Sequence, residues 1–190
     1  MNTLVGMRDN KARRLDWILS SWKGGLILSS RIIRWVPNLF TLGNLICGLF
    51  SITFTISGYF RMAAMLIFLA AFLDVFDGKI ARKLKVNSEL GVELDSLADV
   101  VSFGVAPAVL FHELTTFSWL TSLAFVLYPA MGALRLARFS AHPTIGYFIG
   151  VPITLAGLVM AGMGFFLYSN AVITIVLAIL MVSPIRITKL

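Results

Sequence analysis

The sequence predicts an all-α, polytopic membrane protein with six transmembrane helices and an N-terminal interfacial amphipathic helix. Of its 190 residues 58% are hydrophobic, and the mean hydropathy is +0.90. Both values lie outside the range of soluble globular domains and within that of proteins whose helices cross a bilayer. The apolar runs are too long and too little alternating for the strands of a membrane barrel. Since backbone groups in lipid must pair within helices or closed barrels, helices are the expected elements.

Breaks between apolar runs divide the chain into six expected spans. Pro37 opens the first span, and Gly58-Tyr59 forms a tight turn before the second. Glycines in the fifth span permit close contact between helices. The last span is short for a hydrocarbon core of about 30 Å. The expected spans cover about 36–57, 60–82, 91–111, 117–138, 147–168 and 170–183.

Residues 1–35 form a basic segment ahead of the membrane domain, which covers 36–190. Trp17, Trp22 and Trp35 lie in it among Lys, Arg and short apolar groups. Basic residues beside tryptophan favour a helix in the membrane interface, held by anionic lipid. A disordered basic tail is the alternative, because Gly24-Gly25 interrupts the segment. No apolar stretch precedes a cleavage site, which argues against a cleavable signal peptide.

The basic residues also predict the orientation of the chain. An even number of spans puts both termini on one side, and of the 16 Lys and Arg residues only Arg61 falls on the other. The positive-inside rule makes the basic side cytoplasmic. The expected location is the cell membrane, as a multi-pass protein. The net charge of +7 could favour nucleic acid or anionic lipid, and the membrane class favours lipid rather than nucleic acid.

The sequence gives little support to cysteine or histidine chemistry. Cys47 is the only cysteine and lies in an apolar run, so an intramolecular disulfide or a cysteine metal site is excluded. His112 and His142 are far from each other and from the cysteine, which leaves no zinc-like spacing. We assign none of the three to chemistry.

Four aspartates mark the stretch on which the function depends. Asp74 and Asp77 are separated by three positions and Asp95 and Asp99 by four, so each pair shares one face of a helix. Apolar sequence leads into the first pair and follows the second, which puts the carboxylates at the rim of the membrane. Ionisable groups are costly there and by default functional.

Two such faces set opposite each other bring up to four carboxylates together. Their repulsion must be relieved by protonation or by cations. Hard oxygen ligands at this density suit Mg²⁺ or Mn²⁺, and two ions about 3.5–4 Å apart form the clamp used for displacement at phosphorus. Gly78 and Ala81 would let a phosphate-bearing ligand approach the helix, and Arg82 offers a planar charged group for phosphate.

The same stretch resembles the signature of the CDP-alcohol phosphatidyltransferases. Its pattern is D-x2-D-G-x2-A-R-x8-G-x3-D-x3-D, in which every fixed position is present. The fixed positions are Asp74, Asp77, Gly78, Ala81, Arg82, Gly91, Asp95 and Asp99. The flanking segments PNLFTLGN (37–44), SFGVAPA (102–108), RLARF (135–139) and IGVPITLAG (149–157) resemble the serine-using members of that family.

The resemblance implies an activity and a set of site residues. It implies transfer of the phosphatidyl group from CDP-diacylglycerol to L-serine, with release of CMP, by a homodimer. The positive-inside rule puts both aspartate pairs on the cytoplasmic side of the membrane. Asp74, Asp77 and Asp95 would chiefly bind two divalent cations, while Asp99 would bind the second ion and act as the base. The residues expected to bind the nucleotide or CDP-lipid are Asn38, Thr41, Asp74, Gly78, Ala81, Arg82, Ser88 and Gly91.

Arg135 and Arg138 are the candidates for holding the carboxylate of serine. They lie at the cytoplasmic end of the fourth span, three positions apart. A buried carboxylate needs a charged partner, and the guanidinium matches it with two hydrogen bonds. The alternative is that both arginines anchor the helix at the interface. Glu113 falls at the opposite end of the spans and is not expected to be catalytic.

Three other functions remain open from the sequence. The same chemistry could use another acceptor, glycerol 3-phosphate or inositol phosphate, or an archaeal ether-lipid donor. A cation transporter would explain acidic pairs in membrane helices but not the glycines and the arginine between them. A purely structural role would have the aspartates cap helix ends or pair with Lys79, Arg82 or Lys83, which explains any one of them better than four at this spacing.

Overall fold

The structure is a computed structural model that describes residues 37–84, 89–141, 147–184 and 186–188. It is helical throughout except for one short ribbon of two strands, which confirms the predicted helical fold for this part of the chain. The predicted interfacial helix in residues 1–35 lies outside the described residues. The helices are Pro37–Ile56, α2 (Phe60–Leu84), α3 (Glu89–Asp99), η1 (Val100–Val105), α4 (Ala106–Glu113), α5 (Trp119–Ala141), α6 (Ile153–Phe165) and α7 (Ala171–Val182).

Local sequence signals account for several helix ends. The first helix ends at Ile56, and Gly58 follows with φ of 80°, a backbone conformation that glycine adopts at little cost. The predicted turn at Gly58 is therefore confirmed. At the other end of the chain, the side chain of Asn170 accepts hydrogen bonds from the backbone N–H groups of Val172 and Ile173, at 2.9 and 3.3 Å, and so caps α7.

The third predicted span is a continuous helix that changes its winding. α3, η1 and α4 succeed one another without a break from Glu89 to Glu113, and η1 is a π-helix. A π-turn adds a residue to the helical turn and rotates the residues after it about the helix axis. The wider winding begins directly after Asp99, and the hydroxyl of Tyr128 on α5 donates to the carbonyl oxygen of Phe103 within it, at 3.1 Å. The sequence pattern did not indicate this change.

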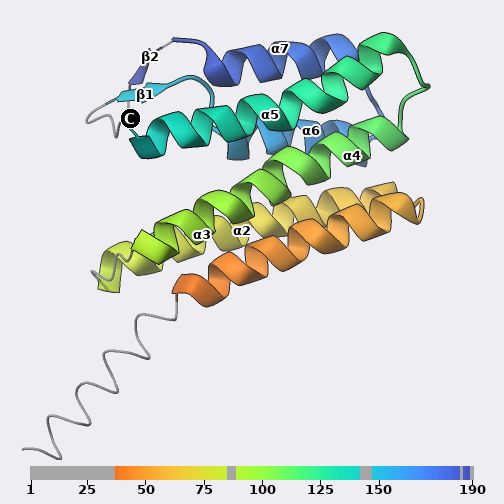
Figure 1. Cartoon of the computed structure of the whole chain (residues 1–190). Helices are drawn as coiled ribbons and strands as arrows, with labels where there is room; N and C mark the ends of the chain where they lie inside the picture. Colours follow the sequence, from red (N-terminus) through yellow and green to blue (C-terminus); the bar gives the residue numbers. More distant parts are fainter. Residues whose placement is uncertain (1–36, 85–88, 142–146, 185, 189–190) are drawn as a thin grey trace, which may run out of the picture.

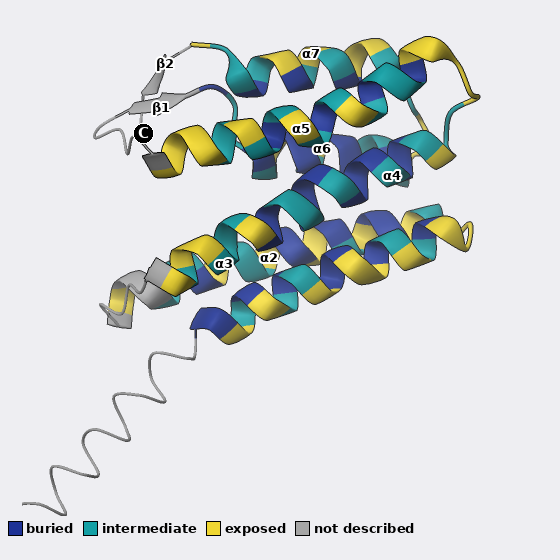
Figure 2. Ribbon diagram, viewed as in Figure 1, coloured by how far each residue is buried: buried dark blue, intermediate teal, exposed yellow. Residues whose placement is uncertain are grey.

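Small residues bring the helices together around a buried core. α5 packs with α7, and α2 packs with α6. A Cβ added at Gly157 of α6 would lie 2.8 Å from the Cβ of Phe103 and 3.0 Å from its Cα, so glycine is required for this approach to η1. This confirms the expectation that glycines in the fifth span permit close contact. Figure 2 shows the buried residues on the faces that the helices turn toward one another.

The fifth span begins later than predicted. Residues Tyr147–Ile149 form strand β1, which pairs antiparallel with β2 (Arg186–Thr188), and α6 starts only at Ile153. Two residues prevent an earlier start. Gly150 has φ of 72°, and Pro152 is extended, with φ of −57° and ψ of 139°. The expected helical start at 147 is therefore wrong for the described residues.

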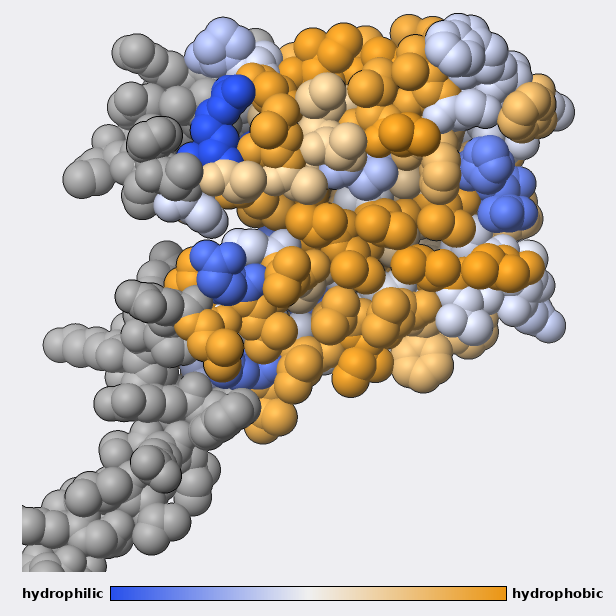
Figure 3. Space-filling view, in the orientation of Figure 1, coloured by the Kyte–Doolittle hydropathy of each residue, from blue (hydrophilic) through white to orange (hydrophobic). Residues whose placement is uncertain are grey.

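In the part of the chain that the structure describes, three helices are long and apolar enough to cross a membrane: Pro37–Ile56, Leu90–Glu113 and Trp119–Ser140. α2 has 25 residues and carries charged groups, while α6 and α7 are apolar but have only 13 and 12 residues. Figure 3 shows a broad apolar surface over the middle of the helices, with hydrophilic residues toward both ends. The protein is thus a helical membrane protein, and the count of six spans stays a prediction.

One end of the bundle gathers the segments that carry the predicted site residues. The start of the first helix, the end of α2, the start of α3 and the end of α5 lie at the same end of the bundle, and the β1–β2 ribbon lies at this end beside α5 (Figure 1). The turns at 57–59, 114–118 and 166–170 lie at the other end. Both aspartate pairs therefore fall at one end of the bundle, and Glu113 falls at the other.

Candidate active site

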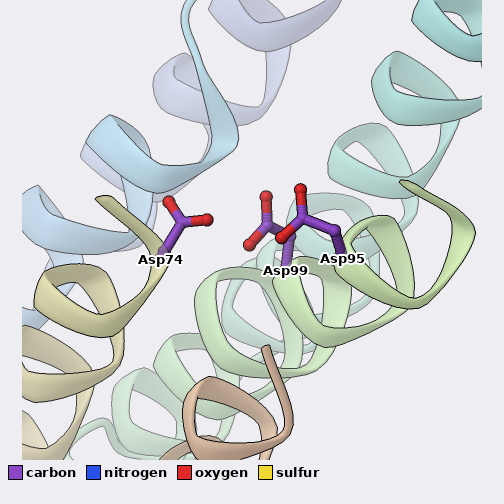
Figure 4. Close-up of side chains that lie close together, drawn as sticks. All are labelled: Asp74, Asp95 and Asp99. Atoms are coloured by element: carbon purple, nitrogen blue, oxygen red, sulfur yellow. The ribbon is translucent and has the colours of Figure 1, made fainter. Parts of the chain in front are cut away.

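Three of the four aspartates form a compact cluster between α2 and α3. One carboxylate oxygen from each of Asp74, Asp95 and Asp99 lies within 4.8 Å of the other two. Figure 4 shows Asp74 reaching from α2 toward Asp95 and Asp99, which project from successive turns of α3. The helical spacing accounts for the closeness of Asp95 and Asp99, because residues four apart share a face of a helix. The packing of α2 beside α3 supplies the third carboxylate.

Asp77 lies beside this cluster and is held by the first helix. Its side chain is buried, and its Oδ2 accepts a hydrogen bond of 2.8 Å from the hydroxyl of Thr41. The same hydroxyl lies 3.2 Å from the carbonyl oxygen of Pro37. Asp77 lies one helical turn from Asp74 on α2 and shares its helix face, so like-charge repulsion links it to the cluster. All four aspartates therefore belong to one electrostatic group, with Asp77 at its edge.

The donor set fits a divalent metal ion. Carboxylate oxygens at these separations repel one another, and a hard cation bound by oxygen ligands relieves the repulsion. Oδ1 of Asp95 is buried and, among the residues that the structure describes, has no hydrogen-bond partner. A buried carboxylate oxygen without a partner is costly unless a ligand supplies one. The cluster offers hard oxygen ligands alone, which suits Mg²⁺ or Mn²⁺ rather than zinc.

Asn44 joins the site, although the sequence pattern gave it no role. Its side chain is fully buried on the first helix, and its Nδ2 donates to Oδ1 of Asp99 at 3.3 Å. Its backbone carbonyl accepts a hydrogen bond of 3.0 Å from the hydroxyl of Ser102. Polar residues at 41 and 44 in an apolar helix share one face, and this spacing was the signal that could have revealed the contact.

A cavity of about 340 Å³ opens beside the aspartate cluster. Arg135 of α5 lines it together with Asp95 and Asp99, and the Nε of Arg135 is buried without a partner among the described residues. Arg138, the other predicted acceptor residue, is exposed and does not line the cavity. The described residues that line it are Val92, Glu93, Asp95, Ser96, Asp99, Arg135, Leu136, Phe139 and Ser140.

The residues predicted to bind nucleotide lie on the first helix and around the α2–α3 connection. Asn38 and Thr41 are buried at the start of the first helix, and Asp74 belongs to the cluster. A Cβ added at Gly78 would meet no atom of the chain within 4 Å. Packing therefore does not demand glycine at that position. Gly91 is half-buried on α3.

Three of the predicted nucleotide residues cannot be located at the side-chain level. Ala81 and Arg82 lie in the last turns of α2, where the structure describes the helix but not their side chains. Ser88 lies outside the described residues.

Cys47, His112 and Glu113, which were not assigned to chemistry, lie away from the cluster, and His142 lies outside the described residues. Cys47 is buried in the hydrophobic core, and the ring of His112 stacks on that of Phe125, with centroids 4.9 Å apart. Glu113 is exposed at the end of α4.

Comparison with known proteins agrees with this site. Residues 34–183 match the CDP-alcohol phosphatidyltransferase family. The chain belongs to this family. A CDP-diacylglycerol–serine O-phosphatidyltransferase of Bacillus subtilis (strain 168) is 40% identical over 136 residues, which cover 70% of this chain and 77% of the relative. The protein of that name from Methanocaldococcus jannaschii is 37% identical over 166 residues, 86% of this chain and 78% of the relative.

A third relative of the same name, from Helicobacter pylori (strain J99), is 40% identical over 129 residues. The matched part covers 65% of this chain and 54% of the longer relative. CDP-alcohol phosphatidyltransferases are enzymes of phospholipid biosynthesis that use CDP-activated lipid and a divalent metal ion. The carboxylate cluster of this family member is compatible with that metal use.

Proposed function

We propose that this protein is a CDP-diacylglycerol–serine O-phosphatidyltransferase, which makes phosphatidylserine and CMP. The observation that carries the proposal is the cluster of Asp74, Asp95 and Asp99 beside a cavity that Asp95 and Asp99 line together with Arg135. This arrangement offers a metal-binding group for a pyrophosphate and, beside it, a cationic pocket for a small anionic alcohol. The names of the relatives at 37–40% identity support serine as that alcohol.

The proposed reaction is a displacement at phosphorus. The hydroxyl oxygen of serine forms a bond to the phosphorus that carries diacylglycerol, the bond from that phosphorus to the CMP oxygen breaks, and CMP leaves with the bonding electrons. Asp99 takes the proton of the serine hydroxyl as general base. Its buried position at the boundary between cluster and cavity supports this role, because a base must reach both the phosphorus and the acceptor.

We propose that Asp74, Asp77, Asp95 and Asp99 together hold two divalent cations, Mg²⁺ or Mn²⁺. The ions would neutralise the pyrophosphate and stabilise the leaving CMP. The aspartates supply the oxygen ligands from two helices, and Thr41 holds Asp77 in its orientation through the 2.8 Å hydrogen bond. The unpartnered Oδ1 of Asp95 supports the presence of a ligand at this point.

The nucleotide side of the site would lie along the first helix and the end of α2. Gly78 faces open space, so its lack of a side chain serves an approaching ligand better than it serves packing. Arg82 would bind a phosphate oxygen. The proposed nucleotide and CDP-lipid residues remain Asn38, Thr41, Asp74, Gly78, Ala81, Arg82, Ser88 and Gly91.

The acceptor would occupy the cavity, with its carboxylate on the guanidinium of Arg135. Buried donors without a partner favour an anionic ligand, and Nε of Arg135 is such a donor among the described residues. Arg138 lies one turn further along α5 at an exposed position, from which it would attract the anion to the cavity. In this proposal Arg135 binds the carboxylate of the acceptor directly, and Arg138 only attracts it toward the cavity.

We also propose a place and an assembly for the enzyme. The chain would lie in the cytoplasmic membrane with six spans, with the active site and both termini on the cytoplasmic side, because the basic residues gather at that end. The family resemblance implies a homodimer. Cross-linking of the purified protein in detergent micelles, followed by electrophoresis, tests the dimer, and a monomer at all protein concentrations would contradict it.

The decisive experiment is an assay of the purified protein with CDP-diacylglycerol, Mg²⁺ or Mn²⁺, and a panel of alcohols. We expect CMP release and phosphatidylserine formation with L-serine, loss of both in excess chelator, and recovery when either metal is restored. Release of CMP with glycerol 3-phosphate or inositol phosphate but not with serine would replace the acceptor. An ether-lipid donor in place of CDP-diacylglycerol tests the archaeal alternative. Cation flux in proteoliposomes without any CMP release would favour the transporter.

A further inference from the structure

We propose that Asn44 is a positioning residue that orients the carboxylate of Asp99 for proton transfer. This inference rests on the proposed function, in which Asp99 is the base, and adds a residue to which the sequence pattern gave no role. Nδ2 of Asn44 donates to Oδ1 of Asp99 at 3.3 Å, and both side chains are buried. A carboxylate with one oxygen held by a donor keeps its other oxygen in a fixed direction.

Asn44 is itself fixed by the helix that carries Asp99. The hydroxyl of Ser102, three residues after Asp99, donates to the backbone carbonyl of Asn44 at 3.0 Å. Gly48 allows the approach, because a Cβ at that position would lie 2.9 Å from the Cα of Ser102. The two hydrogen bonds run in opposite directions between the same two helices. They lock the first helix to the turn that presents Asp99.

The remaining atom of the amide is left without a partner among the described residues. Oδ1 of Asn44 is buried and, in the part of the chain that the structure describes, has no hydrogen-bond partner. A buried amide oxygen left without a donor is unfavourable, and a residue with a packing role alone could be apolar at no such cost. Asn44 does not line the cavity that would hold the acceptor, so its amide acts through Asp99 and not on the acceptor itself.

Ser51 provides a matched control on the same helix. It is fully buried seven residues after Asn44, about 10 Å along the axis, and its hydroxyl donates to the carbonyl oxygen of Ala63 on α2 at 2.9 Å. Ser51→Ala therefore removes a buried contact between helices without touching the site. It should lower the melting temperature and leave turnover unchanged.

The first test separates turnover from binding. Asn44→Leu keeps a similar volume and removes the donor. We expect kcat for phosphatidylserine formation to fall by about 10–100-fold, as for other residues that orient a catalytic group, while binding of CDP-diacylglycerol stays within about threefold of wild type. Turnover that matches Ser51→Ala would overturn the proposal. Lost CDP-diacylglycerol binding with normal kcat would do so as well, and would assign Asn44 to the nucleotide.

The second test needs no turnover and is done in excess chelator. Asn44→Asp places a fifth carboxylate within 3.3 Å of Asp99 and should lower the melting temperature by several degrees. The double variant Asn44→Asp with Asp99→Asn restores an amide opposite a carboxylate and should regain most of that loss, while remaining inactive. A double variant no more stable than Asn44→Asp would show that residues 44 and 99 are not in contact. This measurement stands even if serine is not the acceptor.

Discussion

At the scale of single residues, the site combines charged groups with neutral groups that hold them in place. Thr41 and Asn44 on the first helix donate to Asp77 and Asp99 respectively. A carboxylate at the rim of a membrane is costly, and each such hydrogen bond offsets part of the cost while fixing the direction of the oxygen atoms. The neutral residues therefore offset part of the cost of holding Asp77 and Asp99 at this place, and the rest of the repulsion is left for bound cations to relieve.

Asp99→Asn should slow catalysis and leave substrate binding intact. The amide keeps the shape of the carboxylate and some ability to bind metal but cannot accept the acceptor's proton. We expect kcat to fall by about 10²–10⁴, the usual contribution of a general base, with binding of CDP-diacylglycerol retained. Glu113→Gln, at the exposed far end of α4, is the matched control and should keep wild-type activity. Weak CDP-diacylglycerol binding with near-normal turnover would assign the base to another residue.

The two arginines at the end of α5 should behave differently. Arg135 lines the cavity and Arg138 is exposed, so Arg135→Lys replaces a two-pronged donor by a single ammonium inside the pocket. We expect KM for serine to rise by about tenfold or more in Arg135→Lys and by less than about threefold in Arg138→Lys, with KM for CDP-diacylglycerol unchanged in both. Equal effects, or a wild-type KM in both, would remove Arg135 from the acceptor site.

At the scale of elements, the helix from Glu89 to Glu113 connects the site to the core. Its first part carries Asp95 and Asp99, and its π-helical part comes directly after them. The wider winding there is covered on two sides: Tyr128 donates to the carbonyl of Phe103, and Gly157 packs against the same residue. The direction of the aspartates therefore depends on how α5 and α6 hold this segment.

Two glycines of α6 allow a test of that packing. Gly157→Ala places a methyl group 2.8 Å from the Cβ of Phe103, whereas a Cβ at Gly162 meets nothing within 4 Å. We expect Gly157→Ala to destabilise the protein by about 1–3 kcal/mol through overpacking. Gly162→Ala should be neutral or stabilise it by up to about 1 kcal/mol, since alanine is the better helix former. Thermal unfolding in detergent measures both, and equal stability of the two variants would contradict the packing described.

At the scale of the whole molecule, charge and hydropathy are arranged along the bundle axis. The apolar surface covers the middle of the helices, with hydrophilic residues toward both ends (Figure 3). The aspartate cluster and the cavity lie at the end of the bundle that, among the described residues, also carries Lys79, Lys83, Arg135 and Arg138. A lipid substrate would keep its acyl chains beside the apolar surface and present its pyrophosphate at that end. A water-soluble acceptor would enter from the same side.

The predicted orientation can be measured by labelling cysteines. Cys47 is first replaced by alanine, and Thr116→Cys and Lys83→Cys are then made singly, because both positions are exposed and lie at opposite ends of the bundle. In intact cells, an impermeant thiol reagent should label the variant at 116 and not that at 83. Inverted membrane vesicles should give the reverse. Labelling of position 116 from the cytoplasmic side alone would contradict the arrangement.

The sequence by itself determined the class of the protein and the identity of its charged site. Hydropathy, the spacing of the four aspartates and the small residues between them are properties of local sequence, and a helix of known period turns them directly into shared faces. The bounds of α2, α5 and α7 were predicted to within about three residues on the same basis, while residues 1–35 and Ser88 stay predictions.

The tertiary structure decided the features that depend on packing between distant segments. It brought Asp74 to Asp95 and Asp99, turned Arg135 and not Arg138 into the cavity, and joined Asn44 to Asp99 across 55 positions of sequence. It also introduced the π-helix after Asp99 and the strand before Gly150. None of these can be deduced from periodicity, because the rotation of one helix against another is set by the side chains of both, and these meet only in the folded chain.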